Sequence, residues 1–219
     1  MKDPRAASHN QDPDDEKPVV LIVDDDLAVR EALEDLLRSV DLRVETFGSA
    51  QEFLSANLPA APSCLVLDVR MPGLSGLDLQ AELVKEHVNI PIVFLTGHGD
   101  VPMAVRALRA GAANFLTKPF REQDLLDAVR PALELARQQH QKESRRSDVH
   151  ARFKGLTRRE QEILRLVVTG LVNKQAAFEL GVSEVTVKIH RSNMMRKMGA
   201  RSVPELVRMA DDLGIRPLT

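Results

Sequence analysis

The sequence predicts an α/β protein, in which a (βα)5 domain with a doubly wound parallel sheet precedes a small all-α domain of four helices. Between residues 19 and 139, five short apolar segments alternate with amphipathic stretches, the pattern of parallel strands joined by helices. After residue 150 the strand pattern stops. Residues 1–150 carry 17 Lys and Arg against 25 Asp and Glu, whereas residues 151–219 carry 13 against 7. The basic second domain indicates a nucleic-acid partner, although an ordinary solvated basic surface would give the same count.

Short apolar runs predict the strands of the first domain. The single cysteine, Cys64, lies in one of these runs and is expected to be a small core residue rather than a reactive thiol. The five strands are expected at residues 19–23, 43–47, 64–67, 91–95 and 112–117.

Five helices are expected to connect these strands, and right-handed crossovers place them on both faces of the sheet. Ser49 and Glu52 predict a capping box at the start of the second helix. The last helix has a buried face at helical spacing, formed by Leu125, Leu126, Val129, Leu133 and Ala136. The helices are expected at residues 27–39, 50–57, 75–87, 101–110 and 121–139.

Polar segments set the expected domain boundaries. Residues 1–17 are polar and mostly acidic, without the apolar core of a signal peptide, and are expected to be a disordered tail. Residues 140–152 are expected to be a frayed helix end and a linker. The first domain then covers residues 18–139 and the second covers residues 153–219. No apolar run approaches the length of a membrane span, so we expect a cytoplasmic protein without a membrane partner.

Capping and glycine signals place four helices in the second domain. Thr157 and Glu160 predict a capping box for a helix that runs to about residue 169, where Gly170 ends it. Three more helices are expected at 173–180, 184–198 and 202–213, with Gly181 and Gly199 as helix ends and Ser183 as a cap. A glycine-containing turn between the second and third of the four helices is typical of a helix-turn-helix.

Four strands of the first domain lead into polar side chains. The first is followed by Asp24, the third by Asp68, the fourth by Thr96 and the fifth by Lys118. The carboxyl ends of parallel strands meet at the edge where open α/β sheets bind ligands. Any one of these residues could simply close a strand, but together and in this order they favour a phosphoryl-accepting site.

The first domain resembles the receiver domain of two-component response regulators, which has a CheY-like, flavodoxin-like fold. The resemblance covers about residues 18–139 and is carried by Val23-Asp24-Asp25-Asp26, Leu67-Asp68-Val69-Arg70-Met71-Pro72-Gly73, Thr96-Gly97 and Lys118-Pro119-Phe120. It implies that Asp68 is the phosphoacceptor and that Asp24, Asp25, Asp68 and the backbone carbonyl of Arg70 hold Mg²⁺. Asp26 is then surplus and is expected to be the solvated start of a loop.

The same resemblance assigns a switch to Thr96, Phe115 and Lys118. Lys118 would pair with the phosphoryl oxygens as a point charge, and Thr96 would move toward the phosphoryl group. The resemblance also implies that the Lys118–Pro119 bond is cis. An inward Phe115 ring fits both ordinary core packing and the active state, so the sequence leaves its role open. His98 is expected to be a loop residue. The output face contains apolar residues that could supply a dimer contact or pack on the sheet: Val101, Met103, Ala104, Val105, Leu108 and Ala112.

The second domain resembles the LuxR/NarL-type helix-turn-helix over residues 153–213. The motifs are Leu156-Thr157-Arg158-Arg159-Glu160, Asn173-Lys174-Gln175-Ala176-Ala177 and Val182-Ser183-Glu184-Val185-Thr186-Val187-Lys188-Ile189-His190. In the first domain, residues 71–76 and 96–105 bring the chain closest to the FixJ-like branch of the NarL/FixJ response regulators.

The third helix of this domain has two expected faces. Its core face contains Val187, Met194 and Met198, and His190 is expected to pack rather than read bases. The opposite stripe would enter the major groove, with Lys188, Ile189 and Ser192 at base edges. Phosphate contacts are expected from Lys174, Thr186, Arg191 and Arg196, for which a solvated helix face is the competing interpretation. On the last helix, Val203, Leu206, Val207 and Ala210 fit either dimerisation or inner packing.

The sequence therefore predicts a phosphorylation-dependent, DNA-binding transcriptional regulator of a two-component system, and not an enzyme. A histidine kinase would be the phosphodonor and promoter DNA the target, with a phosphorylation-linked homodimer and RNA polymerase as further candidate partners. Two alternative functions are a DNA binder that ignores phosphorylation, and a phosphatase or phosphotransferase that acts on small molecules through an aspartyl enzyme. The latter would need a second carboxylate at position 70, which is Arg. Receiver motifs in the first half exclude a ligand-sensing LuxR regulator.

Overall fold

The computed structural model describes residues 17–97 and 101–215, and its contacts divide the chain into two compact units between His140 and Gln141. The expected tail, apart from Lys17, and the expected loop residue His98 lie outside the described residues. No helix in the described ranges combines the length and the apolar character that crossing a membrane requires.

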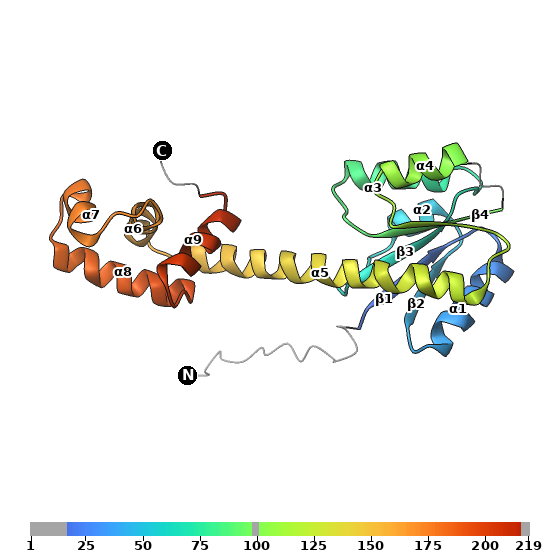
Figure 1. Cartoon of the computed structure of the whole chain (residues 1–219), viewed down its shortest axis with the longest axis horizontal. Coiled ribbons are helices and arrows are strands. Elements are labelled where there is room, and N and C mark those ends of the chain that lie inside the picture. Colours follow the sequence, from blue (N-terminus) through green and yellow to red (C-terminus); the bar gives the residue numbers. More distant parts are fainter. Residues whose placement is uncertain (1–16, 98–100, 216–219) are drawn as a thin grey trace, which may run out of the picture. The chain divides into compact units, whose positions relative to one another are not determined.

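The first unit is built on a five-stranded parallel sheet with the order β2-β1-β3-β4-β5 (Figure 1). The strands are β1 (Val19–Val23), β2 (Arg43–Phe47), β3 (Ser63–Asp68), β4 (Ile92–Thr96) and β5 (Asn114–Thr117). This confirms the predicted doubly wound sheet. The fifth strand begins two residues later than expected, because the Ala112 N–H donates to the Ala107 carbonyl and so belongs to the preceding helix end.

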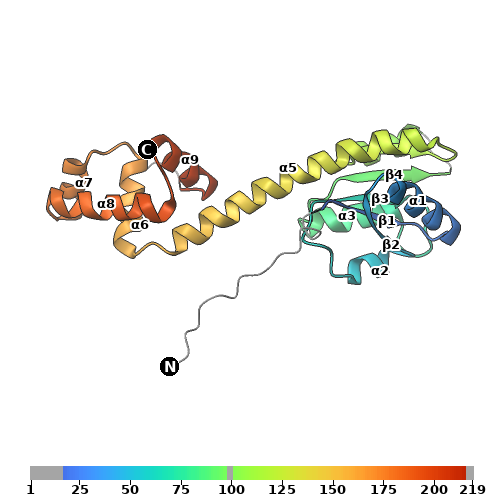
Figure 2. The ribbon, with the colours of Figure 1, turned by 90° about the horizontal axis from the view of Figure 1, so that it is seen from below.

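Helices cover both faces of this sheet, as Figures 1 and 2 show. Side chains alternate along β1, so that Val19 and Leu21 enter one core and Val20 and Ile22 the other. The first core packs under α2 (Ala50–Ser55), α3 (Gly76–Lys85) and α4 (Val101–Arg109). The second packs under α1 (Leu27–Ser39) and the first part of α5 (Glu122–Lys154). Cys64 is fully buried in this second core, as expected.

The capping box expected at Ser49 is only half formed. The Ser49 hydroxyl accepts from the Glu52 N–H at 3.1 Å, but the Glu52 carboxylate accepts from the Gly48 N–H at 2.6 Å instead of returning to Ser49. A complete box caps α3, where Ser75 and Asp78 exchange hydrogen bonds.

The expected linker at 140–152 is wrong as secondary structure, because α5 continues through it to Lys154. Residues 141–148 are all exposed, which explains why their polarity suggested a linker. The segment contains no Gly or Pro, and Arg, Gln, Lys and Glu are good helix formers. Buried side chains anchor the helix on both sides of this segment: Leu133 in the second core of the first unit and Val149 in the core of the second unit.

The second unit is all helical, with α6 (Arg158–Val168), α7 (Asn173–Leu180), α8 (Glu184–Met198) and α9 (Val203–Asp212). Its capping signals are confirmed: Thr157 and Glu160 form a box, and Ser183 caps α8. Glycines in the left-handed region end α7 and α8, at Gly181 and Gly199. Leu206 and Ala210 of α9 are buried in the core of this unit and Val203 and Val207 pack against it, which supports inner packing.

Candidate functional site

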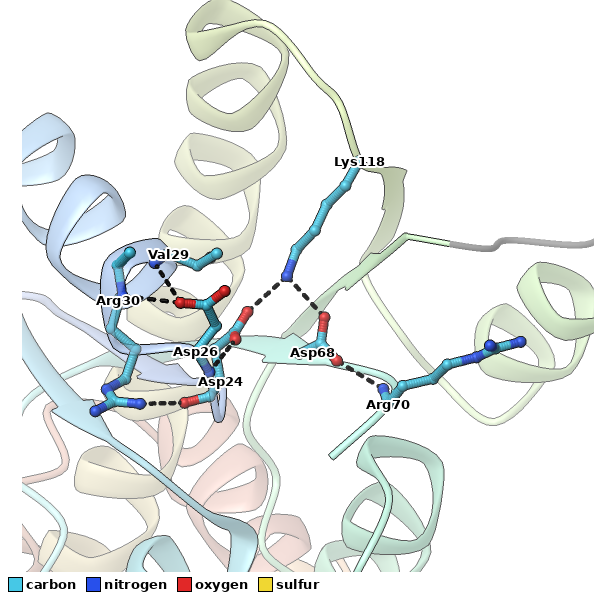
Figure 3. Close-up of polar contacts among 8 residues, drawn as sticks. Asp24, Asp26, Val29, Arg30, Asp68, Arg70 and Lys118 are labelled. Atoms are coloured by element: carbon cyan, nitrogen blue, oxygen red, sulfur yellow. Dashed lines mark hydrogen bonds and ion pairs between the residues drawn. The ribbon is translucent and has the colours of Figure 1, made fainter. Parts of the chain in front are cut away.

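The carboxyl ends of β1, β3 and β5 bring three charged side chains together (Figure 3). Lys118 Nζ lies 2.6 Å from Asp24 Oδ2 and 2.8 Å from Asp68 Oδ1. Both carboxylates are buried, with side-chain exposures of 2% and 8%, and the lysine side chain is 24% exposed. The structure therefore brings together Asp24, Asp68 and Lys118 as a single cluster, as the strand ends predicted.

Backbone N–H groups orient the two carboxylates of this cluster. Asp68 Oδ2 accepts from the Arg70 N–H at 2.7 Å, and Asp24 Oδ1 accepts from the Asp26 N–H at 3.0 Å. Each of the four carboxylate oxygens thus has one donor, and each keeps a lone pair for a further ligand. The side chain of Arg70 extends away from the cluster (Figure 3) and is exposed, so only its backbone contributes.

Burial and charge shift two pKa values in the cluster. Burial raises the pKa of Asp68, and the negative charge of Asp24 raises it further, while the hydrogen bond from Lys118 only partly offsets these effects. For Lys118, burial alone would lower the pKa, but the hydrogen bonds to Asp24 and Asp68 outweigh it and raise the pKa. The lysine thus stays charged, and the two carboxylates share its single positive charge.

The neighbouring acids Asp25 and Asp26 behave differently from Asp24. Asp25 is exposed and its carboxylate forms no hydrogen bond or ion pair with a described residue. Asp26 was expected to be a solvated loop start, but it is the N-cap of α1, where its carboxylate accepts from the Ala28 N–H at 2.9 Å. A carboxylate at a helix N-terminus satisfies free N–H groups there and complements the helix dipole.

The oxygen donors of this edge suit Mg²⁺, which prefers carboxylate and carbonyl ligands and keeps several waters. Asp24 and Asp68 share one ammonium, so the buried pair retains a net negative charge. Throughout the described ranges, however, no three acidic, His or Cys side chains are grouped closely enough to form a metal site. The structure thus brings Asp24 and Asp68 together but not Asp25, and the ligand set stays a prediction.

Two predicted switch residues, Thr96 and Phe115, lie on β4 and β5. Thr96 is fully buried at the end of β4, and its carbonyl accepts from the Lys118 N–H at 2.7 Å. Phe115 is partly buried against the core under α2, α3 and α4, with its ring centroid 6.3 Å from that of Phe94. The Lys118–Pro119 bond is cis, as the resemblance implied.

Some apolar residues of the expected output face pack on the core and others are exposed, and the sequence had left both possibilities open. Met103 and Ala112 pack against the core, whereas Val105 and Leu108 are substantially exposed. Ala104 is intermediate. The side chain of Val101 lies outside the described part of the chain.

Two residues that shape the site were not anticipated from the sequence. Arg30 on α1 donates through Nη1 to the Asp24 carbonyl at 2.7 Å and so fixes the chain at the end of β1 (Figure 3). Gly76, the first residue of α3, lies against Asp68: a Cβ at this position would lie 2.2 Å from the Asp68 carbonyl oxygen. The motif Met71–Gly76 contained a signal for Gly76, because glycine marks a close backbone approach. No sequence pattern pointed to Arg30.

In the second unit, α8 has the two faces that its periodicity predicted. Val187, Met194 and Met198 are fully buried. The opposite stripe is exposed and consists of Lys188, Ile189, Ser192 and Arg196. Lys174 on α7 is exposed as well, and His190 is partly buried.

Two of the residues predicted to contact phosphate have partners within the protein. Arg191 Nη1 donates to Asn173 Oδ1 at 2.8 Å and thereby ties α8 to the start of α7. The Thr186 hydroxyl lies 2.8 Å from the Ser183 hydroxyl in the first turn of α8. Both side chains are partly buried, so their position also serves the fold.

Comparison with known families gives two matches. The family described as response regulator receiver domain matches residues 20–130, and that described as bacterial regulatory proteins, luxR family, matches residues 154–210.

Individual proteins are similar over most of the chain. Nodulation protein W of Bradyrhizobium diazoefficiens is 52% identical over 91% of this chain and 88% of its own length. The transcriptional regulatory protein FixJ of Azorhizobium caulinodans is 48% identical over 90% of this chain and 94% of its own length. A solved structure of the response regulator StyR has a TM-score of 0.80 and 51% identity, covering 89% of this chain and 98% of that one.

Proposed function

Because the chain belongs to the response regulators that join a receiver domain to a LuxR-family DNA-binding domain, we propose that Asp68 accepts a phosphoryl group from a sensor histidine kinase. This phosphorylation would control DNA binding. The observation that carries this proposal is the bridge from Lys118 to Asp24 and Asp68. A preorganised ammonium beside a buried carboxylate supplies positive charge where phosphoryl oxygens would arrive.

In the proposed transfer, an Asp68 carboxylate oxygen attacks the phosphorus atom of a phosphohistidine. The new P–O bond forms as the P–N bond breaks, and the electron pair of that bond leaves with the imidazole. Lys118 and the Arg70 N–H orient the carboxylate beforehand. The partly exposed lysine side chain can then follow the negative charge onto the phosphoryl oxygens.

The proposed Mg²⁺ ligands are Asp24, Asp25, Asp68 and the backbone carbonyl of Arg70, with waters in the remaining positions. When bound, the ion would supply positive charge to the phosphoryl oxygens, which bear much of the charge in such transfers. The raised pKa of Asp68 supports the need for a further cation at this edge.

The switch in this proposal uses Thr96 and Phe115. The Thr96 hydroxyl would turn toward the phosphoryl group, and the Phe115 ring would fill the space that it leaves. Phe115 lacks a hydroxyl, so it can report the change only through packing.

DNA is contacted, in this proposal, by the exposed stripe of α8. Lys188, Ile189 and Ser192 would approach base edges, and Lys174, Thr186, Arg191 and Arg196 would contact phosphates. Binding as a phosphorylation-linked homodimer would place two such helices on two half-sites. A promoter target makes RNA polymerase a further candidate partner and the cytoplasm the expected location.

Phosphorylation of full-length protein with acetyl phosphate and Mg²⁺ tests the proposal. Intact-mass measurement should show one phosphoryl group on the wild type and on Asp26→Asn, because Asn caps a helix as well as Asp does. Asp68→Asn should remain unmodified. Phosphorylation should also raise DNA affinity in the wild type and in Asp26→Asn, but not in Asp68→Asn.

Two results would contradict the proposal. Labelling of Asp68→Asn would move the phosphoacceptor elsewhere. A DNA affinity that is the same before and after labelling of Asp68 would favour a phosphorylation-independent DNA binder. The alternative, a phosphotransferase that acts through an aspartyl enzyme, predicts turnover of small phosphate esters. That chemistry requires a second carboxylate at position 70, where this chain has Arg. The proposal therefore describes a regulator and not an enzyme.

A further inference from the structure

Large apolar side chains are exposed on the helix-turn-helix of the second unit. Among the described residues of this unit, the exposed large hydrophobic side chains are Val172 at the start of α7, Phe178 on α7, and Val185 and Ile189 on α8. None of these four lies on α6 or α9. Because single exposed apolar residues are common, these side chains indicate a partner only where two of them share one side of a helix.

Val185 and Ile189 are four positions apart on α8, and so lie one above the other on the same side of the helix. They are 68% and 56% exposed. Lys188 lies beside them, is exposed, and forms no ion pair with a described residue. The face therefore combines two branched apolar side chains with an ammonium group that is free to pair with a partner.

The charge of the region favours DNA rather than protein as the occupant of this face. Residues 151–219 carry 13 Lys and Arg against 7 Asp and Glu. Duplex DNA matches this excess through its phosphates and offers one apolar group in the major groove, the 5-methyl group of thymine. Recognition helices also present their N-terminal residues to base edges, and Val185 is the second residue of α8.

We propose that Val185 and Ile189 together read the 5-methyl groups of two thymines in each half-site. This inference rests on the proposed DNA-binding function and adds Val185 as a specificity-determining residue. Four residues of α-helix rise about 6 Å, and successive bases of a strand are about 3.4 Å apart, so the two thymines should lie about two base-pair steps apart. Lys188 would donate to guanine acceptors near them.

The test uses full-length protein phosphorylated with acetyl phosphate and Mg²⁺, and DNA selected from a random pool by the wild type. Each thymine of the selected half-site is then replaced by uracil, which removes only the methyl group. Affinities are measured for the wild type, Val185→Ala and Ile189→Ala. Val84→Ala on α3 is the matched control, since Val84 is a helical valine that is 61% exposed in the first unit.

A methyl contact predicts non-additive losses. Uracil at one position should weaken wild-type binding about fourfold, the effect of one buried methyl-sized group. The same uracil should not change the DNA affinity of Val185→Ala. At a second position, uracil should weaken DNA binding by the wild type but not by Ile189→Ala. Val84→Ala should respond to uracil as the wild type does.

Three results would overturn the inference. The selected half-site could lack thymine, uracil could leave wild-type affinity unchanged, or Val185→Ala could keep the full sensitivity to uracil. In each of these cases sequence-specific DNA binding would still stand. If the selection enriches no sequence at all, the proposed DNA-binding function fails, and the inference with it.

Discussion

Replacing Lys118 by Met should destabilise the first unit, because it leaves two buried carboxylates without their shared cation. Asp24 and Asp68 are 2% and 8% exposed and both contact the ammonium within 2.8 Å. Removing one partner of a buried ion pair costs about 3–5 kcal/mol. The lower end applies here because the lysine side chain is 24% exposed and water can enter in its place. We expect a loss of about 3 kcal/mol at pH 7, equivalent to a decrease of roughly 10 °C in melting temperature.

Scanning calorimetry is the appropriate assay, since the chain contains neither Trp nor Tyr for fluorescence and has two units that can melt separately. Lys85→Met is the matched control: Lys85 is 69% exposed and pairs with Glu82 on the surface of α3, so its loss should cost under about 0.5 kcal/mol. Adding Asp24→Asn to Lys118→Met should restore part of the stability, because only one buried charge then remains.

The pH dependence of the Lys118→Met deficit has a definite sign. The pKa of Asp68 is already raised in the folded wild type and should rise further without the lysine. A carboxylate with a raised folded-state pKa opposes folding above its unfolded-state pKa, and this penalty fades as pH falls through the folded-state value. The difference between variant and wild type should thus shrink on acidification from pH 7. A melting temperature equal to that of Lys85→Met, or a deficit that grows in acid, would refute the reasoning.

Three further predictions concern single side chains. Gly76→Ala should lower the free energy of unfolding by about 3 kcal/mol in calorimetry, because the new Cβ would lie 2.2 Å from the Asp68 carbonyl oxygen. The control Gly48→Ala should change stability little, because a Cβ there meets only side-chain atoms, the nearest at 3.5 Å. Equal effects of the two substitutions would contradict this prediction. Glu160→Gln should cost about 1–2 kcal/mol at pH 7, since Lys197 Nζ donates to Glu160 Oε2 at 2.7 Å. The pKa of Glu160 is lowered because hydrogen bonds from Lys197 and Thr157 outweigh burial, so the wild-type advantage should disappear as pH falls through that pKa, and an advantage that persists in acid would count against the pair. Cys64 is fully buried and burial raises its pKa to about 12, so a thiol reagent should modify it only as the protein unfolds; rapid native-state labelling would show an opening that the core packing does not suggest.

The fold could be predicted from the sequence because its signals are local and strong. Five apolar runs with helical stretches between them are enough to specify a parallel sheet with helical crossovers. Periodicity also identified the buried face of α8, where Val187, Met194 and Met198 are fully covered. Capping residues located the starts of three helices, at Ser49, Thr157 and Ser183, because a hydroxyl or carboxylate there accepts from the first-turn N–H groups.

The end of α5 could not be predicted by the same means. The segment 141–148 shows no apolar periodicity because no side chain in it is buried. Its helical state follows from propensity and from anchoring at both ends, in particular by Val149, whose burial depends on residues far along the chain. Polarity alone therefore does not show that a segment leaves the helical state, since a segment between two units can itself be helical.

At the acidic edge, the sequence identified the reacting groups but not the residues that hold them. Asp24, Asp68 and Lys118 were found because they follow separate strands whose carboxyl ends meet at one edge of the sheet, and because together they match the receiver pattern. Arg30 acts on a backbone carbonyl, an interaction that any long polar side chain on α1 could make, so its type and position carry no signal. Asp26 was misjudged because three consecutive carboxylates look alike in sequence, whereas Asp24 joins the buried cluster and Asp26 caps α1.

A similar limit applies to the two faces of α8, and it bears on how the helix would bind DNA. A period of 3.6 residues separates the buried and exposed stripes clearly, but Thr186 and Arg191 fall between them. Each already has a partner in the protein, Ser183 and Asn173 respectively. A phosphate contact from either residue would have to share or replace that hydrogen bond, whereas the exposed Lys188 loses no intramolecular partner among the described residues. The net gain from each phosphate contact is therefore smaller at the boundary of the helix face than at its centre.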